Sequence, residues 1–419
     1  MQNRTAISDS PNLSSAADLP TGVVLHGTQR YTVSMISDPR AVLFVLTLVV
    51  VVSLFLEKHV PLCRAVGAAL VSLLTGMLLS NIGILPGTSP TYDFLIGPGV
   101  SVGIALILFN VNIRSILDAG PQMLAAFGLG ALGTAVGAVV GALMLSGLVG
   151  PETWKLAGQF TGTYTGGGVN FAALGQALDT SPTMFSAAVA ADVMLTAIWM
   201  AACLAVPVLL GRKKAEPNVA PPSETPDDSS KPQTLEHALS SSGRPIHIAD
   251  AAALVALAIG TVWGAGKLAE IFSFLPEVLW LTTLVLVVAQ IPAVKSIAGG
   301  ALFGNYLILL FLAGNGAQSV IANIVAVGPA VFYFALITVA MHGAVIFGLG
   351  MLLRIDLPTL AVASQANVGG AASAMAIAGA RGYADRLLPG VAVGLLGYAI
   401  GNYTGFAIAR LVQALLGAG

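Results

Sequence analysis

Two short stretches place polar side chains beside consecutive glycines in a chain that is otherwise apolar. The first is TGTYTGGGVN, residues 161–170, and the second is SQANVGGAAS, residues 364–373. Hydroxyl and amide oxygens suit small hard cations, and glycine permits the backbone conformations that a helix break needs. A half-helix that begins after such a break offers unpaired N–H groups and a positive dipole end to an anion. Both stretches therefore have the chemistry of an ion-binding or anion-binding site.

The spacing of the two stretches favours binding over simple packing. Small residues are also common where membrane helices touch, because they let two backbones approach closely. However, Gly167 and Gly369 lie 202 residues apart, and AGP at 119–121 and VGP at 327–329 lie 208 residues apart, which indicates a duplicated unit. We expect substrate contacts from these residues: Thr163, Tyr164, Thr165, Gly166, Gly167, Gly168, Asn170, Gln365, Asn367, Gly369, Gly370 and Ser373.

Asp192 is the candidate ion-coupling residue. It lies in the middle of the apolar segment 181–211, with no basic residue within reach along that segment. A carboxylate at membrane depth is costly unless it is hydrated, paired or neutralised. We expect Asp192 to bind Na+ with oxygens of Thr163, Asn170 and Asn367, or to carry a proton. The alternative is a protonated Asp192 that only hydrogen-bonds a neighbouring helix.

Other polar residues in apolar segments give weaker signals. His342 could be a proton carrier or a neutral bridge between helices, and the sequence does not separate the two. The remaining set is typical of hydrogen bonds between helices: Asn110, Asn112, Asn315, Gln318, Asn402, Tyr403 and Thr404. Cys63 and Cys203 have no spacing typical of a disulfide framework or a metal site, so we expect them to pack, and we expect no metal other than a transported Na+.

The elements that position these residues are membrane helices. Hydrophobic residues make up 56% of 419 and charged residues 9%, and the mean hydropathy is +0.88. A helix needs about 20 apolar residues to cross the hydrocarbon core. Ten segments are predicted to cross fully: 41–56, 65–83, 93–112, 121–147, 181–211, 248–270, 277–292, 299–318, 329–354 and 387–415. Two Gly-broken segments, 152–179 and 357–381, are predicted to be discontinuous or re-entrant.

The polar segments divide the chain into four parts. Residues 1–37 are polar and lack the apolar core of a signal peptide, so a disordered tail is expected. Residues 38–211 form the first transmembrane repeat. Residues 212–246 are rich in Pro, Ser and charge, which predicts a hydrophilic linker on the cytoplasmic side. Residues 247–419 form the second repeat.

The distribution of Lys and Arg favours inverted repeats. If both broken segments are re-entrant, each half crosses five times and the halves have opposite orientation. With an outside N-terminus, this arrangement leaves four basic residues near the spans on the outer side: Arg40, Lys155, Lys267 and Arg410. Twelve full crossings with an inside N-terminus would leave six: Lys58, Arg64, Arg114, Lys267, Arg381 and Arg386. Because basic residues prefer the cytoplasmic side, the five-plus-five topology is preferred.

Four longer motifs carry a resemblance to a known family: GTYTGGGVNFAAL, AVAADVML, ASQANVGGAASAMAIAGARGY and PGVAVGLLGYAIGNYTGFAIA. They resemble the domain-of-unknown-function 819 family of bacterial and plant membrane proteins, from about residue 40 onward. More distantly, the two Gly-Gly segments resemble the GGxG motifs of glutamate/sodium and citrate/sodium symporters, although VGGAAS lacks the final glycine. This resemblance implies a dimerisation domain, a homodimer, and a mobile core that carries discontinuous helices.

The sequence therefore predicts a secondary transporter in the cytoplasmic (inner) membrane. Cation-coupled symport of a small polar or anionic metabolite is the preferred mechanism, and a cation/proton antiporter is the close alternative. No cofactor is expected beyond Na+ or H+ as the coupling ion, and no nucleic-acid partner. An enzyme is not expected, because Asp192 lacks the partner carboxylate of an aspartyl hydrolase. A serine mechanism would need a base near Ser373, and the only deep candidate, His342, belongs to no recognisable motif. A passive channel is disfavoured by the paired breaks.

Overall fold

The computed structural model describes residues 23–26, 29–32, 34–210 and 245–417. Two short antiparallel strands, β1 (Val23–His26) and β2 (Gln29–Thr32), precede the first helix. Within the predicted tail, residues 23–32 thus contain a small hairpin, whereas residues 1–22 lie outside the described part. Most of the predicted linker, residues 211–244, also lies outside the described residues.

The rest of the described chain is helical, as the sequence predicts. The first half contains α1 (Pro39–His59), α2 (Pro61–Asn81), α3 (Pro90–Phe94), the π-helical turn η1 (Leu95–Gly99), α4 (Val100–Leu108), α5 (Ile113–Leu117), α6 (Pro121–Val149), α7 (Thr153–Gly166), α8 (Gly168–Ala177) and α9 (Pro182–Leu210). The second half contains α11 (Ile248–Ile271), α12 (Glu277–Val288), α13 (Pro292–Lys295), α14 (Gly300–Ala317), α15 (Ile321–Leu352), α16 (Leu357–Ala380) and α17 (Ala384–Leu415). Several of these helices begin with proline, whose missing N–H costs nothing in the first turn.

Nine described segments are long and apolar enough to cross a membrane. Eight of them match predicted full spans, and the ninth is α16, one of the two Gly-broken segments. The other two predicted spans, 65–83 and 277–292, are shorter than expected. A break at Gly67, with φ 76° and ψ 157°, interrupts α2, and α12 has only 12 residues. The chain is an all-α polytopic membrane protein.

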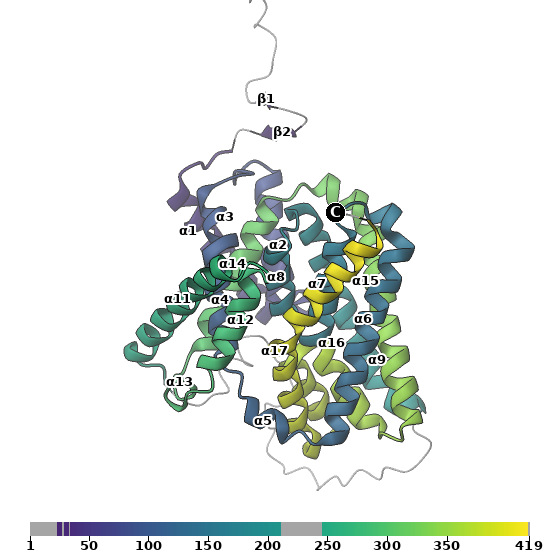
Figure 1. Ribbon diagram of the computed structural model, residues 1–419. Helices are drawn as coiled ribbons and strands as arrows, with labels where there is room; N and C mark the ends of the chain where they lie inside the picture. Colours follow the sequence, from purple (N-terminus) through teal and green to yellow (C-terminus); the bar gives the residue numbers. More distant parts are fainter. Residues whose placement is uncertain (1–22, 27–28, 33, 211–244, 418–419) are drawn as a thin grey trace, which may run out of the picture.

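The helices pack as two groups, which lie on the left and right of Figure 1. The α14 group consists of α1–α4 and α11–α14, and the α15 group consists of α6, α7, α9 and α15–α17. Helix α8 lies between them and contacts α4 and α12 on one side and α7 and α17 on the other. Each half of the chain contributes helices to both groups, so the two halves are intertwined in space.

Glycines bring the helices of the α15 group unusually close together. Three glycines on α7 face three on α17 in reverse order: Gly158 with Gly405, Gly162 with Gly401, and Gly166 with Gly397. A Cβ added at Gly158 would lie 2.9 Å from the carbonyl oxygen of Gly405. Because van der Waals contact replaces the hydrophobic effect as the force between helices in lipid, such ladders suit the membrane interior. Helices α7 and α17 are therefore antiparallel and almost in backbone contact.

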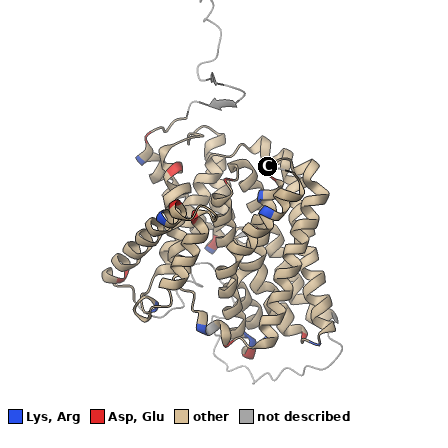
Figure 2. Cartoon of the chain, in the orientation of Figure 1, with Lys and Arg blue, Asp and Glu red and all other residues tan. Residues whose placement is uncertain are grey.

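The Lys and Arg residues lie toward the helix ends. Figure 2 shows the Lys and Arg positions near helix ends and connecting segments, with most of the apolar body free of them. From Arg40 to Arg410, every described Lys or Arg lies in the first or last two turns of a helix or between helices. A basic side chain at the middle of the bilayer would be costly. Among the described residues, the interior of the α15 group is consequently without a Lys or Arg side chain.

Candidate functional site

The first Gly-broken segment is a re-entrant hairpin. Helix α7 ends at Gly167, whose φ of 85° and ψ of 176° turn the chain, and α8 then runs back along α7. The side chain of Leu174 lies against Gly162, and that of Leu178 lies against Gly158. At the open end, the Lys155 ammonium donates to the carbonyl oxygen of Asp179 at 2.5 Å. Both arms therefore begin and end on the same side of the membrane.

The second Gly-broken segment turns in the same way. Gly370 has φ 78° and ψ −170°, which nearly repeats the conformation of Gly167. Val362 from the arm before the break and Ala374 from the arm after it both lie against Gly390 of α17. Arg386, just after the returning arm, pairs with Asp356, just before the first arm, at 3.1 Å. The segment α16 is thus also re-entrant. Of the two predicted alternatives, a re-entrant segment or a discontinuous helix that crosses fully, the structure has the re-entrant one.

The structure corrects the position of the second break. The repeat spacing points to Gly369, but Gly369 has no positive φ and the turn occurs at Gly370. A Cβ at Gly369 would meet the side chains of Gln365 and Ser373, at 2.6 Å and 2.5 Å. A positive φ with an extended ψ is essentially restricted to glycine. Gly167 and Gly370, 203 residues apart, are therefore the equivalent positions.

The tips of the two hairpins touch each other. A Cβ at Gly167 would lie 3.6 Å from both the Cα and the nitrogen of Gly370, and 3.6 Å from the ring of Tyr398. The Tyr398 hydroxyl oxygen would lie 3.0 Å from a Cβ at Gly370. Sequence reasoning did not single out Tyr398, because a tyrosine in an apolar segment gives no local signal. The structure places it on α17 between the two tips.

Asp192, on α9, lies beside Thr163 of α7, which is about one helical turn before Gly167 at the first tip. Its carboxylate oxygens accept hydrogen bonds from the Thr163 hydroxyl at 3.4 and 3.3 Å. The Tyr164 hydroxyl also lies beside this carboxylate, but it makes no hydrogen bond of ordinary geometry. Asp192 is only 9% exposed, and no basic side chain pairs with it among the described residues. A carboxylate in these surroundings can be neutralised by a small cation or by a proton.

Other predicted ion ligands have different neighbours. Asn170 donates its amide to the carbonyl oxygens of Gly397 at 3.0 Å and Gly162 at 3.4 Å, so it joins α8 to α17 and α7. The Asn367 amide can donate to the carbonyl oxygens of Ala363 at 3.1 Å and Phe127 at 3.2 Å. Of the three predicted oxygen ligands, only Thr163 contacts Asp192 in the described structure. Gly166, a predicted substrate contact, instead packs against the backbone of Gly397.

Several buried polar atoms beside the tips have no hydrogen-bond partner. They include the Thr165 hydroxyl, the Tyr164 hydroxyl and both amide atoms of Gln365, all in side chains that are 0% exposed. Buried polar groups are nearly always paired, with protein or with ordered water, so each exception calls for an explanation. Unpaired groups therefore occur on both hairpins, close to their tips, where a polar ligand or water would find hydrogen-bond partners.

His342 lies in a second buried polar cluster, formed by residues of α6, α9, α15 and α16. Its Nδ1 donates to the Gly130 carbonyl oxygen at 2.9 Å, because a carbonyl can only accept. Its Nε2 then accepts from the Ser364 hydroxyl at 2.8 Å, and Ser364 accepts from the Trp199 indole at 2.9 Å. The Thr134 hydroxyl, 3.0 Å from Nδ1, donates to the Tyr164 carbonyl oxygen at 2.9 Å. A neutral ring satisfies this whole network, which supports the bridging role.

The distance between His342 Nε2 and Ser364 Oγ, 2.8 Å, is typical of a general base and a serine nucleophile. The surroundings of this pair differ from those in a serine hydrolase. The other ring nitrogen faces a carbonyl oxygen and a threonine, where a hydrolase commonly has a carboxylate. Both side chains are 0% exposed. Ser373, the serine considered in the sequence, donates to the Gly369 carbonyl oxygen at 2.9 Å, and no hydrogen bond joins it to His342.

Removing His342 should chiefly lower stability. We expect His342→Ala to cost roughly 2–4 kcal/mol, because it leaves the Ser364 hydroxyl without its acceptor and opens a cavity. His342→Gln should recover part of the loss, since an amide can both donate and accept. The measurement is the thermal unfolding midpoint of the purified protein in detergent. An unchanged midpoint together with a shifted pH dependence of transport would instead support a proton carrier.

Of the remaining predicted polar residues, some join helices, whereas Asn110, Gln318 and Thr404 bond within their own helix. Asn402 donates to the Thr282 hydroxyl at 3.0 Å, and the Tyr403 and Thr283 hydroxyls lie 2.6 Å apart. These contacts connect α17 of the α15 group to α12 of the α14 group. Others connect neighbouring turns or helices: Asn110, Asn112, Asn315, Gln318 and Thr404.

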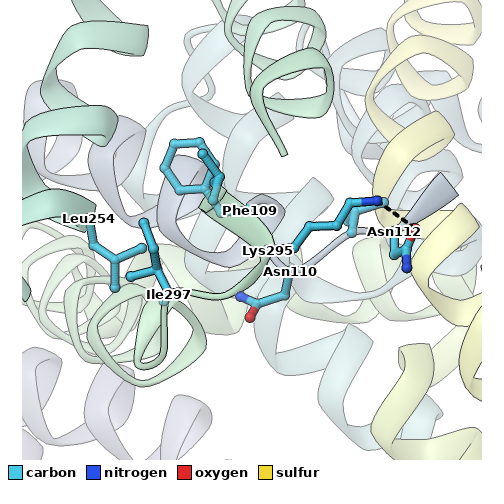
Figure 3. Close-up of a pocket in the computed structure, with 9 residues that line it drawn as sticks. Phe109, Asn110, Asn112, Leu254, Lys295 and Ile297 are labelled. Carbon is cyan, nitrogen blue, oxygen red and sulfur yellow. Dashed lines mark hydrogen bonds between the residues drawn. The ribbon is translucent and has the colours of Figure 1, made fainter. Parts of the chain in front are cut away.

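A pocket of about 240 Å³ lies in the α14 group, away from the hairpins. Figure 3 shows Lys295 reaching toward Asn112, whose side-chain oxygen accepts its hydrogen bond at 3.0 Å, and Asn110 pointing in a different direction. The lining also includes Leu254 and Gly300, but no residue of α7, α8 or α16. This pocket is thus separate from the candidate site around the hairpin tips and Asp192.

Comparison with known proteins agrees with this architecture. The family model described as "Protein of unknown function (DUF819)" matches residues 41–415. The chain is also 30% identical over 370 residues to the "Uncharacterized membrane protein YjcL" of Bacillus subtilis (strain 168). That match covers 84% of this chain and 92% of the relative. The range matched by the family model includes both re-entrant hairpins and Asp192. The chain therefore belongs to the DUF819 family of integral membrane proteins.

Proposed function

We propose that this protein is a secondary active transporter that couples a Na+ or H+ gradient to the symport of a small polar or anionic metabolite. The observation that carries the proposal is the meeting of two re-entrant hairpin tips beside a buried carboxylate without a basic partner. Irregular backbone at membrane depth is tolerated only inside protein or along a wet cavity. Paired helix interruptions in a repeated chain mark the binding site in many secondary transporters.

Alternating access would come from movement of the α15 group against the α14 group. The side-chain hydrogen bonds between the groups include Asn402 with Thr282, Tyr403 with Thr283, Ser186 of α9 with Asn315 and Ser319, and a cluster at α8. In that cluster the Gln176 amide donates to the Gly97 carbonyl oxygen at 3.1 Å, within the π-helical turn η1. A pocket of about 230 Å³ lies beside this contact. Small polar contacts of this kind can break and re-form at a low free-energy cost.

The re-entrant hairpins support the inverted five-plus-five topology. If each hairpin returns to its own side, each half has an odd number of crossings, and the two halves must then have opposite orientation. The antiparallel pair of α6 and α15, which are equivalent in the two halves, agrees with this: Gly137 lies against Thr338 and Gly141 against Phe334. The first hairpin would enter from outside and the second from the cytoplasm.

Cysteine labelling tests this topology. In a background with Cys63→Ser and Cys203→Ala, Ser229→Cys in the linker should be shielded from an impermeant thiol reagent in intact cells. Thr5→Cys should react under the same conditions, because the N-terminus is proposed to lie outside. Both should react in permeabilised cells, which provides the control. Labelling of Ser229→Cys from outside would refute the inverted arrangement.

Reconstitution tests the transport function directly. Proteoliposomes should produce a transient current or a pH change when a metabolite mixture is added in the presence of an inward Na+ or H+ gradient, and the signal should disappear when the gradient is collapsed. Fractionation of the mixture then identifies the substrate. Solute flux that persists without a gradient and does not saturate would favour a channel over a transporter.

A cation/proton antiporter is the second candidate, and Asp192 is the observation that favours it. A single buried carboxylate can bind Na+ and H+ in turn, because only one of them neutralises it at a time. An antiporter predicts Na+-dependent proton movement in vesicles that contain no metabolite, whereas the symporter predicts none. A pH-sensitive dye in the vesicle lumen distinguishes the two.

A further inference from the structure

The hairpin tips expose the N-terminal ends of two half-helices. Helix α8, ten residues long, begins at Gly168, and the returning arm of α16 begins at Ala371. Gly168 and Ala372 are exposed, and nothing lies within 4 Å of a Cβ added at Gly168. The first N–H groups of a helix have no partner within it, and together with the dipole they attract an anion.

A second, independent feature at the tips points to a ligand. The Gln365 side chain is 0% exposed, and neither of its amide atoms has a hydrogen-bond partner. Its nitrogen lies against Gly369 next to the Ser373 hydroxyl, so that the two arms of the hairpin meet there. The Tyr398 hydroxyl lies beside Gly370 and the backbone of Ala371. These donors surround the place where the half-helices begin.

The charges available at the tips limit the charge of the ligand. Each helix N-terminus is equivalent to roughly half an elementary charge, so two of them compensate about one negative charge. No described Lys or Arg lies near the tips, because all of them lie close to helix ends or between helices. Asp192 adds a negative charge of its own, which the coupling ion would neutralise. A second carboxylate on the ligand would therefore remain without compensation.

We propose that the two hairpin tips bind a small monocarboxylate, with its carboxylate at the N–H groups of α8 and the returning arm of α16 and with Gln365 and Tyr398 as additional donors. This inference rests on the proposed transport function. It narrows the substrate class from polar or anionic metabolites to those with a single carboxylate and no second net negative charge.

A ligand panel on the purified, full-length protein tests the charge limit. The probes are acetate, propionate, lactate and pyruvate, the matching neutral amides, and malonate, succinate and malate as dicarboxylates, each titrated in Na+ and in choline. Thermal stabilisation should rise and saturate with at least one monocarboxylate. Its amide and the dicarboxylate of similar size should bind at least about tenfold more weakly, because a charge-assisted hydrogen bond is lost or a charge is left unpaired. Equal stabilisation by the amide or by a dicarboxylate would overturn the inference.

Two glutamine variants separate binding from folding. Gln365→Leu should keep the folded protein, since it replaces an unpartnered buried amide by an apolar side chain of similar size, but it should reduce monocarboxylate stabilisation at least about tenfold. Gln159→Leu is the matched control, because the Gln159 side chain is also 0% exposed and unpartnered. Gln159 lies eight residues before Gly167 at the first tip, and its side chain packs against Gly175 of α8. Gln159→Leu should bind the monocarboxylate like the unmodified protein. Equal effects of the two variants would contradict the proposal.

The same assay distinguishes the failure of this inference from the failure of the transport function. Stabilisation by Na+, or by protonation, in the absence of any organic probe reports on Asp192 and belongs to the transport proposal. If the cation acts but no carboxylate does, the monocarboxylate inference is wrong and the transport proposal stands. If neither cation nor carboxylate acts and reconstituted vesicles show no gradient-driven flux, both are wrong.

Discussion

Asp192→Asn should abolish gradient-driven accumulation of substrate in proteoliposomes. The substitution preserves the size of the side chain and its contact with the Thr163 hydroxyl, but it removes the negative charge that would hold Na+ or a proton. We expect the affinity for the coupling cation to fall at least about tenfold, since even indirect partners of bound metals change affinity by 10–100-fold. The measurement is substrate uptake under imposed Na+ and H+ gradients, normalised to folded protein.

A structural role for Asp192 gives the opposite pattern. If the carboxylate only stabilises the contact between α9 and α7, Asp192→Asn should lower the unfolding midpoint while coupling stays normal in the molecules that fold. Exchange of substrate across the membrane without a gradient should survive in the coupling interpretation, because the hairpin tips are intact. Full accumulation in Asp192→Asn would remove this residue from the coupling mechanism.

Gly370→Ala and Gly167→Ala should each eliminate most transport. Both glycines have a positive φ with an extended ψ, where another residue is strained by roughly 1–3 kcal/mol. At Gly370 the new methyl group would also lie 3.0 Å from the Tyr398 hydroxyl oxygen, so relief of the strain would displace the tip. We measure initial uptake rates, and the amount of folded protein by size-exclusion chromatography of a fluorescent fusion.

Two comparisons isolate the cause of this loss. Gly348→Ala, on a helical and open stretch of α15, should leave uptake unchanged and change stability by less than about 1 kcal/mol. Gly369→Ala should reduce uptake less than Gly370→Ala, because Gly369 has no positive φ and its neighbours belong to side chains, two of them side-chain ends that can move. A larger loss at Gly369 than at Gly370 would show that the turn conformation is not what matters.

The helices could be predicted from the sequence because their signal is local. Apolar runs are long, and proline or glycine stands at many of their ends, so the predicted spans agree with the helices within a few residues in most cases. The start of α15 is an exception, since Pro329 suggests a boundary whereas the helix begins at Ile321. The break at Gly67 was also missed, because a single glycine with no polar flank looks like packing.

Part of the candidate site could be predicted and part could not. The contact between Thr163 and Asp192 was predicted, because Asp192 follows the first break closely in sequence. The roles of Tyr398 and Ser364 were not, because they depend on which helices pack together. In a membrane protein, the helix face that packs on other helices and the face that contacts lipid are both apolar. The sequence therefore says little about which helices lie next to one another. The second tip was placed one residue early for a related reason: adjacent glycines look alike until their dihedral angles are known.

The contact between α7 and α17 also determines when the molecule can assemble. Gly166 meets Gly397 of the last helix, 231 residues later in the chain (397 − 166). At a synthesis rate of 5–20 residues per second, the ribosome needs about 10–50 s to produce that partner. During this interval the first hairpin, with its unpaired hydroxyls and exposed backbone groups, has no final neighbour in the bilayer. Biogenesis would then depend on the insertion machinery to shelter the hairpin, and chains that end before α17 would be substrates for membrane proteases.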